Sequence, residues 1–215
     1  MKFTSETKFF LGIIGITLLI LFAAITIMSK PSKPLTKEAL IPDSAPTRGN
    51  KNANVWLVEF SDFQCPACKL FANVVDDLAK AYPDTLFIAY RHFPLPQHPF
   101  AKKAAIAAEA AGKQGKFWDM DRLLFTNQET LSETKVVELA TSLNLDMTAF
   151  ASGSGDSTIQ SKIDMDVAYG NSIGINATPT FYLNGMKLEL ASPNDLKTKV
   201  EEMITKSQNT MTKSQ

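Results

Sequence analysis

The feature that most constrains the fold of this chain is a strand pattern that runs directly into a helix pattern between residues 55 and 81. Residues 55–60 form an almost uninterrupted apolar run, which is typical of a central strand covered on both faces. After a short loop, Pro66 fits the first position of a helix, where no backbone N–H is needed. The helix predicted from Pro66 to about Ala81 carries apolar residues at helical spacing, so one of its faces is expected to be buried. The sequence therefore predicts an α/β fold.

The only two cysteines among the 215 residues, Cys65 and Cys68, stand at the start of this predicted helix. Cys65 lies at the positive end of the helix dipole, which favours a thiolate over a thiol. Two other interpretations are a pair of small buried residues and half of a zinc site. A zinc site needs two more ligands, and the only histidines, His92 and His98, are six residues apart and flanked by prolines. The strand, loop and helix context therefore favours a redox-active pair.

Glu59 is an acidic residue inside the predicted central strand, where a carboxylate is costly unless it is paired or has a function. One interpretation is that Glu59 points outward at the strand end or pairs with a lysine. The other follows from its place six residues before Cys65, from where it can reach beneath the helix toward Cys68. Burial would raise its pKa and allow it to exchange a proton with Cys68 when that thiol changes state.

The pattern Val-Glu-Phe-x-x-Phe-x-Cys-Pro-x-Cys at residues 58–68 resembles the active site of DsbA-like thiol:disulfide interchange proteins. The resemblance extends over about residues 50–206 and includes an Arg-His-Phe-Pro-Leu segment, a Gly-Lys-Phe-Trp segment and a Gly-Ile-Asn-Ala-Thr-Pro-Thr-Phe segment. These lie at residues 91–95, 115–118 and 174–181. It implies a thioredoxin fold with a helical insertion at about residues 100–152. It also implies a cis peptide bond at Pro179, whereas a proline at the start of a strand is ordinarily trans.

The same resemblance assigns roles to individual residues. Cys65 becomes the attacking cysteine, Cys68 the resolving cysteine and Glu59 a buried acid. No metal and no cofactor is expected besides the disulfide of the cysteine pair. The residues expected to contact substrate are Thr178, Pro179, Pro66 and Ala67. Ala67 departs from the pattern, because strongly oxidising members of the family often carry histidine there.

The N-terminal region predicts a membrane anchor. Residues 9–28 contain no charge and are long enough to cross a bilayer, whereas a cleaved signal peptide has a shorter apolar region and a small-residue cleavage site. We expect a short tail at 1–8, a single-pass transmembrane helix at 9–28 and an extended proline-rich linker at 29–52. Cleavage of the segment is the alternative, because Ala23 and Ala24 are small. Lysines flank both ends of the run, so charge hardly decides its orientation. The cysteine pair favours a domain outside the cytoplasm of a bacterial cell.

The remainder of the chain suits one thioredoxin-like domain over residues 53–206. We expect a second strand at 85–90, a proline-broken loop at 91–99 that contains both histidines, and helices through 100–152 that serve packing and shape a groove. Thr130 with Glu133 suggests a capping box, and residues 153–155 a flexible joint. Asn184-Gly185 between two apolar runs predicts a two-residue hairpin. Residues 207–215 are expected to form a disordered tail.

The predicted function is that of a membrane-tethered oxidoreductase that introduces disulfides into exported proteins with cysteines. A DsbB-like membrane partner would reoxidise it, because the chain has no second cysteine pair for an internal relay. The first alternative is a reductase or isomerase that a membrane electron donor keeps reduced. A second is a copper carrier that uses the two thiols as soft ligands. Twenty-two basic and 22 acidic residues leave no net charge, so nothing indicates nucleic-acid binding.

Overall fold

The structure is a computed structural model that describes residues 11, 13–22 and 33–213. The chain divides into two units, Met1–Lys33 and Pro34–Gln215, which are considered separately. In the first unit, residues 13–22 are helical. Within the described ranges, no helix combines the length and the apolar character needed to cross a membrane. The predicted tail at 1–8, and residues 9, 10, 12 and 23–28 of the predicted anchor, lie outside the described residues.

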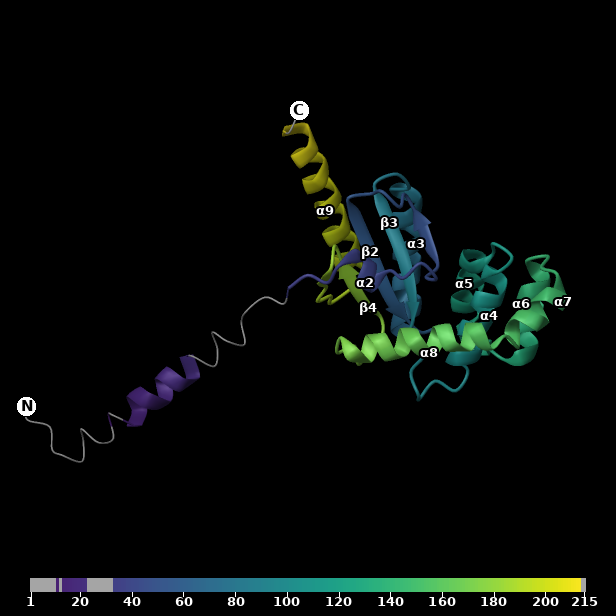
Figure 1. The fold of residues 1–215 in the computed structure, drawn as a ribbon, viewed down its shortest axis with the longest axis horizontal. Helices are drawn as coiled ribbons and strands as arrows, with labels where there is room; N and C mark the ends of the chain where they lie inside the picture. Colours follow the sequence, from purple (N-terminus) through teal and green to yellow (C-terminus); the bar gives the residue numbers. More distant parts are fainter. Residues whose placement is uncertain (1–10, 12, 23–32, 214–215) are drawn as a thin grey trace, which may run out of the picture. The chain divides into compact units, whose positions relative to one another are not determined.

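The second unit is built on a mixed sheet with the strand order β1-β3-β2-β4-β5 (Figure 1). Its strands are β1 (Thr47–Gly49), β2 (Val55–Ser61), β3 (Leu86–His92), β4 (Thr180–Leu183) and β5 (Met186–Lys187). The central strand β2 pairs in parallel with β3 and antiparallel with β4, and residues 57–61 are all buried. The prediction of a central strand covered on both faces is therefore confirmed.

Helices cover both faces of this sheet and form a separate cluster beside it (Figure 1). Side chains of α3 and α9 pack on one face, and α2 and α8 pack on the other. The cluster of α4 to α7, with the 3-10 helix η1, corresponds to the predicted insertion. The helices are α2 (Lys37–Leu40), α3 (Pro66–Ala81), α4 (Ala101–Gly112), α5 (Phe117–Thr126), η1 (Gln128–Thr130), α6 (Glu133–Ser142), α7 (Met147–Ser154), α8 (Ser157–Ser172) and α9 (Pro193–Lys213).

The alternation of side chains along the strands places polar groups beneath α3. Val55 and Leu57 of β2 pack against α3 and α9, whereas Val58 and Phe60 belong to the core on the opposite face. Because side chains on a strand alternate with a period of two, Glu59 lies on the same face as Leu57. This part of the sheet thus presents a carboxyl group toward the helix that carries Cys68.

The linker predicted at 29–52 is wrong from Pro34 onward, since this segment packs onto the sheet. Leu40 is fully buried on the α2 and α8 face, and the Leu35 N–H donates a hydrogen bond to the Gly185 carbonyl at 2.9 Å. Strand β1 pairs with the edge of β3. The apolar residues between the prolines therefore supply core contacts, and the prolines separate short elements within a packed segment.

Other boundaries also differ from the sequence predictions. Helix α9 continues to Lys213, so a disordered tail is wrong for residues 207–213. Helix α7 includes two of the three residues predicted as a joint, and α6 is capped by Ser132, whose hydroxyl accepts from the Lys135 N–H, and not by Thr130. Strand β3 extends through Arg91 and His92, which pair in register with Phe60 and Ser61 of β2. The buried Asp166 carboxylate accepts hydrogen bonds from the Arg91 side chain and the His92 N–H. The predicted hairpin is confirmed, with positive φ angles of 47° and 83° at its two turn residues.

Candidate active site

The two cysteines lie where β2 passes into α3, and they differ in exposure. Cys65 occupies the N-cap position of α3, and Pro66 is the first residue of the helix. Both cysteines are free thiols. Cys65 is 7% exposed and Cys68 is fully buried. Cys65 is thus the more accessible thiol, although its exposure is lower than expected for a residue at a helix start.

Neutral hydrogen-bond donors stabilise a thiolate at Cys65. A hydrogen bond from the Cys68 thiol is the largest cause that lowers the pKa of Cys65 to about 5, against the opposing effect of burial. The backbone N–H groups of Cys68 and Ala67 contribute in the same direction. These N–H groups belong to the first turn of α3, where they have no partner within the helix. The structure therefore agrees with the predicted effect of the helix start.

Cys68 has the opposite electrostatic environment. Burial raises the pKa of its thiol well above the ordinary value, and the neighbouring Cys65 raises it further. At neutral pH the pair consequently holds one proton, which resides on Cys68 while Cys65 is charged. A nucleophile and a proton-bearing partner thus stand side by side, as thiol–disulfide exchange requires.

The segment before β4 meets the cysteine pair although it is 113 residues away in sequence. The Cys65 thiol contacts the Thr178 carbonyl oxygen, with Sγ and O separated by 3.3 Å. The Thr178–Pro179 peptide bond is cis, as expected from the resemblance. Thr178, Pro179 and Ala67 are half-buried and Pro66 is exposed. The structure thus brings Thr178 directly to the attacking sulfur, and the roles of all four residues in substrate contact stay a prediction.

Glu59 is buried beneath α3, in agreement with the second interpretation of this residue. Its side chain is 3% exposed, and its Oε1 accepts no hydrogen bond within the described part of the chain. Burial raises the pKa of the Glu59 carboxyl to about 7, whereas the Ser61 hydroxyl and the Arg48 guanidinium oppose the rise. The group can therefore change its protonation state near neutral pH.

The helical insertion supplies two polar residues that sequence analysis missed. Gln128 is buried, and its amide donates hydrogen bonds to the carbonyls of Phe63 at 2.8 Å and Cys65 at 3.0 Å, which fixes the loop before α3. Asp121 is 6% exposed and belongs to α5. The sequence pattern could have indicated a buried Asp121, because this residue shares the apolar face of α5 with Phe117, Met120, Leu124 and Phe125. The insertion therefore does more than pack and shape a groove.

The two histidines make contacts that hold the structure near the site. The Asp62 carboxylate, in the loop before Cys65, lies 2.7 Å from His98 Nδ1 and accepts the Leu95 N–H at 2.8 Å. His92 is buried in β3, and its Nε2 lies 2.8 Å from a carboxylate oxygen of Glu109 on α4. Arg91 pairs with Asp166 on the opposite face of the sheet. The loop therefore positions the segment around Cys65, and the charge of Arg91 is engaged elsewhere.

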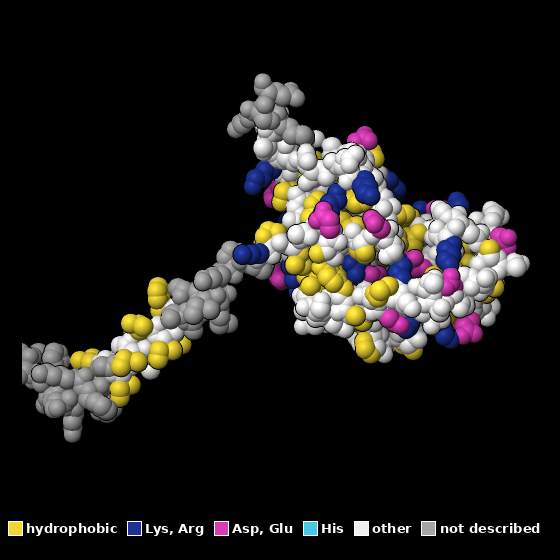
Figure 2. All heavy atoms as spheres, viewed as in Figure 1, with side chains coloured by type: hydrophobic (Ala, Val, Ile, Leu, Met, Phe, Trp, Pro, Cys, Tyr) yellow, Lys and Arg dark blue, Asp and Glu magenta, His cyan; other side chains and the backbone are white. Residues whose placement is uncertain are grey.

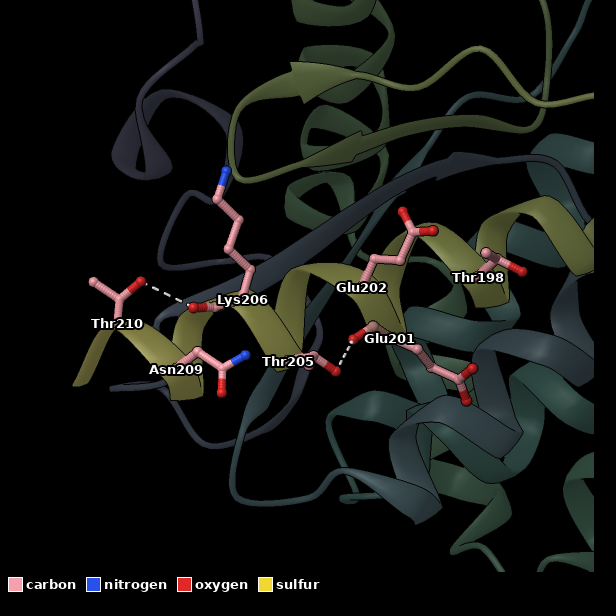
Figure 3. Close-up of a pocket in the computed structure, with 7 residues that line it drawn as sticks. All are labelled: Thr198, Glu201, Glu202, Thr205, Lys206, Asn209 and Thr210. Carbon is pink, nitrogen blue, oxygen red and sulfur yellow. Dashed lines mark hydrogen bonds between the residues drawn. The ribbon is translucent and has the colours of Figure 1, made fainter. Parts of the chain in front are cut away.

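A broad hollow on the described surface lies apart from these residues. It is about 660 Å³ and open, and it runs along the exposed face of α9 between Thr198 and Thr210 (Figure 3). The hydroxyls of Thr205 and Thr210 donate to carbonyls of their own helix.

On the visible face of the second unit, basic and acidic side chains are interspersed (Figure 2). Among the described residues, no group of three or more histidine, cysteine and acidic side chains is placed to hold a metal.

Comparisons with known proteins point to one fold. A family model described as thioredoxin matches residues 43–202. The thiol-disulfide exchange protein alpha-DsbA2 from Wolbachia pipientis is 22% identical, with a TM-score of 0.70 over 78% of this chain and 91% of that one. A thioredoxin-like oxidoreductase from Silicibacter pomeroyi DSS-3 is 27% identical, with a TM-score of 0.67 over 79% of this chain and 98% of that one. The predicted DsbA-like resemblance and the fold with a helical insertion are confirmed, and these neighbours agree with the predicted enzyme class.

A curated relative matches at higher identity but is a much longer protein. The Na(+)/H(+) antiporter NhaA 3 of Salinispora tropica is 37% identical over 147 residues, which is 68% of this chain and 22% of the antiporter. The chain thus spans about a fifth of the length of that relative.

Proposed function

Since this chain belongs to the thioredoxin family, we propose that it is a thiol:disulfide oxidoreductase in which Cys65 attacks and Cys68 resolves. The observation that carries this proposal is the placement of two free thiols at one helix start, with the more accessible Cys65 at the N-cap and Cys68 fully buried one turn later. A thiolate is the nucleophile in disulfide exchange, and the Cys65 pKa of about 5 leaves that sulfur ionised at neutral pH. The buried Cys68 keeps its proton until it is needed.

We propose oxidation of substrate thiols as the direction of the reaction. A substrate thiolate attacks the Cys65–Cys68 disulfide at Cys65, and Cys68 leaves and gains a proton. A second substrate thiolate then attacks the substrate sulfur of the mixed disulfide, so that Cys65 leaves as a thiolate and the substrate gains a disulfide. Two electrons pass to the cysteine pair. Every group that stabilises the Cys65 thiolate favours the reduced form and makes the pair a better oxidant.

The strength of this oxidant is expected to be moderate. The residue before Cys68 is Ala67, which contributes a backbone N–H to Cys65 and carries no imidazole. A reductase or isomerase kept reduced by a membrane electron donor is therefore the second candidate. In either case Pro66, Ala67, Thr178 and Pro179 would border the substrate, because Thr178 already contacts the attacking sulfur. A strand-like substrate segment could pair with this backbone.

We further propose that the domain works outside a bacterial cytoplasm on exported proteins and is anchored by residues 9–28. The support is the uncharged run in the sequence together with a cysteine pair suited to an oxidising compartment. A quinone-linked, DsbB-like membrane protein would regenerate the disulfide. The test is to treat intact cells with a membrane-impermeant thiol reagent after mild reduction. Labelling of Cys65 only after lysis would place the domain inside.

The enzymatic proposal is tested by insulin reduction and by oxidation of a reduced, unfolded ribonuclease. Wild type should exchange disulfides in both assays, and Cys65→Ser should be inactive. Cys68→Ser should accumulate mixed disulfides through Cys65, whereas Cys65→Ser should trap few. A copper titration in parallel addresses the carrier alternative. Tight copper binding without disulfide exchange would overturn the proposal.

A further inference from the structure

Asp121 is a buried acidic residue of α5 that borders a hollow on the surface near Glu59. The hollow is about 220 Å³, and its lining includes Asp121, Lys69, Asn73, Asp76 and Arg122. Although Asp121 borders this hollow, its side chain is only 6% exposed. Its Oδ1 has no hydrogen-bond partner within the described part of the protein. A buried, unpartnered carboxyl oxygen is costly, so its retention indicates a function or a shared proton.

On its inner side, Asp121 belongs to a cluster that reaches Cys68. Burial raises the pKa of Asp121 well above its ordinary value, and the charge of Glu59 raises it further. Burial also raises the pKa of Tyr90, with Asp121, Glu59 and Cys68 all adding to the rise. Glu59 and Tyr90 are direct neighbours on β2 and β3, and the Tyr90 ring packs against Phe117 of α5, one helical turn before Asp121, at a centroid distance of 5.4 Å. Tyr90 and Cys68 belong to the same buried core cluster. Glu59, Tyr90 and Asp121 are therefore neighbouring buried polar groups beside Cys68.

The other charged groups around this cluster are already paired with one another. Arg48 Nη1 lies 2.5 Å from Asp76 Oδ1, and Arg122 Nε lies 3.4 Å from Asp76 Oδ2. The Arg48 guanidinium also stacks over the ring of Trp118. Arg48 and Arg122 lower the pKa of Asp121, and Asp76 raises it, but burial and Glu59 outweigh the two arginines. Among the residues that the structure describes, the carboxyl groups of Glu59 and Asp121 therefore have no ion-pair partner.

We propose that Asp121 and Glu59 form a coupled carboxyl pair that passes the proton of Cys68 to and from the hollow. This inference rests on the proposed function. When the protein itself is oxidised, Cys68 gives its proton to the Glu59 carboxylate and attacks the Cys65 sulfur of a mixed disulfide, and the substrate leaves as a thiolate. Asp121 releases its own proton to solvent at the hollow and accepts the one from Glu59. The opposite direction reverses each step.

The pairing of two carboxyl groups explains how one site can both accept and donate a proton near neutral pH. Two like charges in a buried cluster cannot both form readily, so the pair loses its protons in two separated steps. Between these two steps, one carboxyl group of the pair is protonated and the other is a carboxylate that can accept a proton. Asp121 acts on the thiols only through Glu59, and its contribution is access to solvent.

The decisive measurement is a carbon-13 NMR titration of the Glu59 carboxyl in the full-length oxidised protein, in which neither cysteine titrates. Glu59→Gln assigns the signal. In wild type the signal should move in two steps, because it senses the titration of Asp121 as well as its own. Asp121→Asn should leave a single step, and Asp121→Glu should retain two. A single step in wild type, or an unchanged two-step curve in Asp121→Asn, would overturn the inference. A single step in wild type overturns the inference without any variant, and Asp121→Ser replaces Asp121→Asn if the latter does not fold.

A kinetic measurement then tests the role of the relay. At pH 7 in dilute buffer, Asp121→Asn should slow the Cys68-dependent resolution of a mixed disulfide by about tenfold, since the proton path to solvent is cut. The first attack by Cys65, measured in a Cys68→Ser background, should change less than about twofold. The matched control is Asp164→Asn, an exposed aspartate on α8 that pairs with Lys102 and does not border the hollow. Equal resolution rates in wild type and Asp121→Asn would contradict the relay. The NMR titration needs no substrate, so its result is separable from a failure of the proposed function.

Discussion

The buried Glu59 carboxyl should make the protein less stable as pH rises, and Glu59→Gln should remove this dependence. In the folded protein its pKa is about 7, against 4.5 for the ordinary group. At about 1.4 kcal/mol for each pH unit, this difference corresponds to about 3 kcal/mol. Because water penetration and relaxation reduce such penalties, we expect about 2–3 kcal/mol.

The sign follows from proton linkage. Below pH 4.5 the group is protonated in both the folded and the unfolded protein, so it has no effect on the pH dependence. Between pH 4.5 and about 7 the unfolded chain binds fewer protons than the folded one, so the free energy of unfolding falls as pH rises. Above about pH 7 the penalty is complete. Glu59→Gln should therefore match wild type at pH 4 and exceed its stability by the full amount at pH 8.5.

The assay is urea unfolding of the oxidised proteins at pH 4, 5.5, 7 and 8.5, with the disulfide intact so that no thiol titrates. Glu202→Gln is the matched control, since Glu202 is exposed on α9, and its difference from wild type should vary little with pH. If the difference between wild type and Glu59→Gln is the same at all four pH values, the Glu59 carboxyl has an ordinary pKa in the folded protein. The argument from burial would then be wrong.

Three further predictions concern the cysteine pair and its loop. In the reduced protein, thiolate absorbance should rise with a midpoint near pH 5, the pKa of Cys65. Cys68→Ala should move this midpoint upward, because the hydrogen bond from the Cys68 thiol is the largest cause that lowers the Cys65 pKa. A wild-type midpoint near pH 9 would refute a lowered pKa at Cys65. The dithiol form should resist urea better than the disulfide form, since a pair that oxidises others is one whose reduced form the fold favours, and the reverse order would support a reductase. Gln128→Ala should cost about 1–3 kcal/mol in urea unfolding, because it leaves the carbonyls of Phe63 and Cys65 buried without their donor. An exposed substitution on the same segment, Glu129→Ala, is its control, and equal stability of the two variants would contradict a structural role for the amide.

The local part of the active site could be predicted from the sequence. A strand, a loop and a helix that starts at Pro66 are properties of neighbouring residues, and so is the placement of Cys65 at the helix start. The position of Glu59 in an apolar run six residues before Cys65 left two interpretations open, and the structure supports the one in which Glu59 is buried beneath α3. The approach of Pro179 was implied by the family resemblance, because nothing near it in sequence points to the cysteines.

The long-range part of the site was decided by the tertiary structure. Asp121 lies on α5 and Gln128 on η1. The sequence periodicity of such an element indicates that one face is buried, but it does not indicate which distant residues cover that face. The contact of Cys65 with Thr178 joins residues 113 apart. Likewise, the segment from Pro34 to Asn52 is rich in proline and polar residues, and its packing depends on an edge of β3 that only the folded sheet provides. Local sequence sets backbone geometry and the sign of an electrostatic effect, whereas the burial that gives Glu59 and Asp121 their raised pKa values arises only when distant helices close over the sheet.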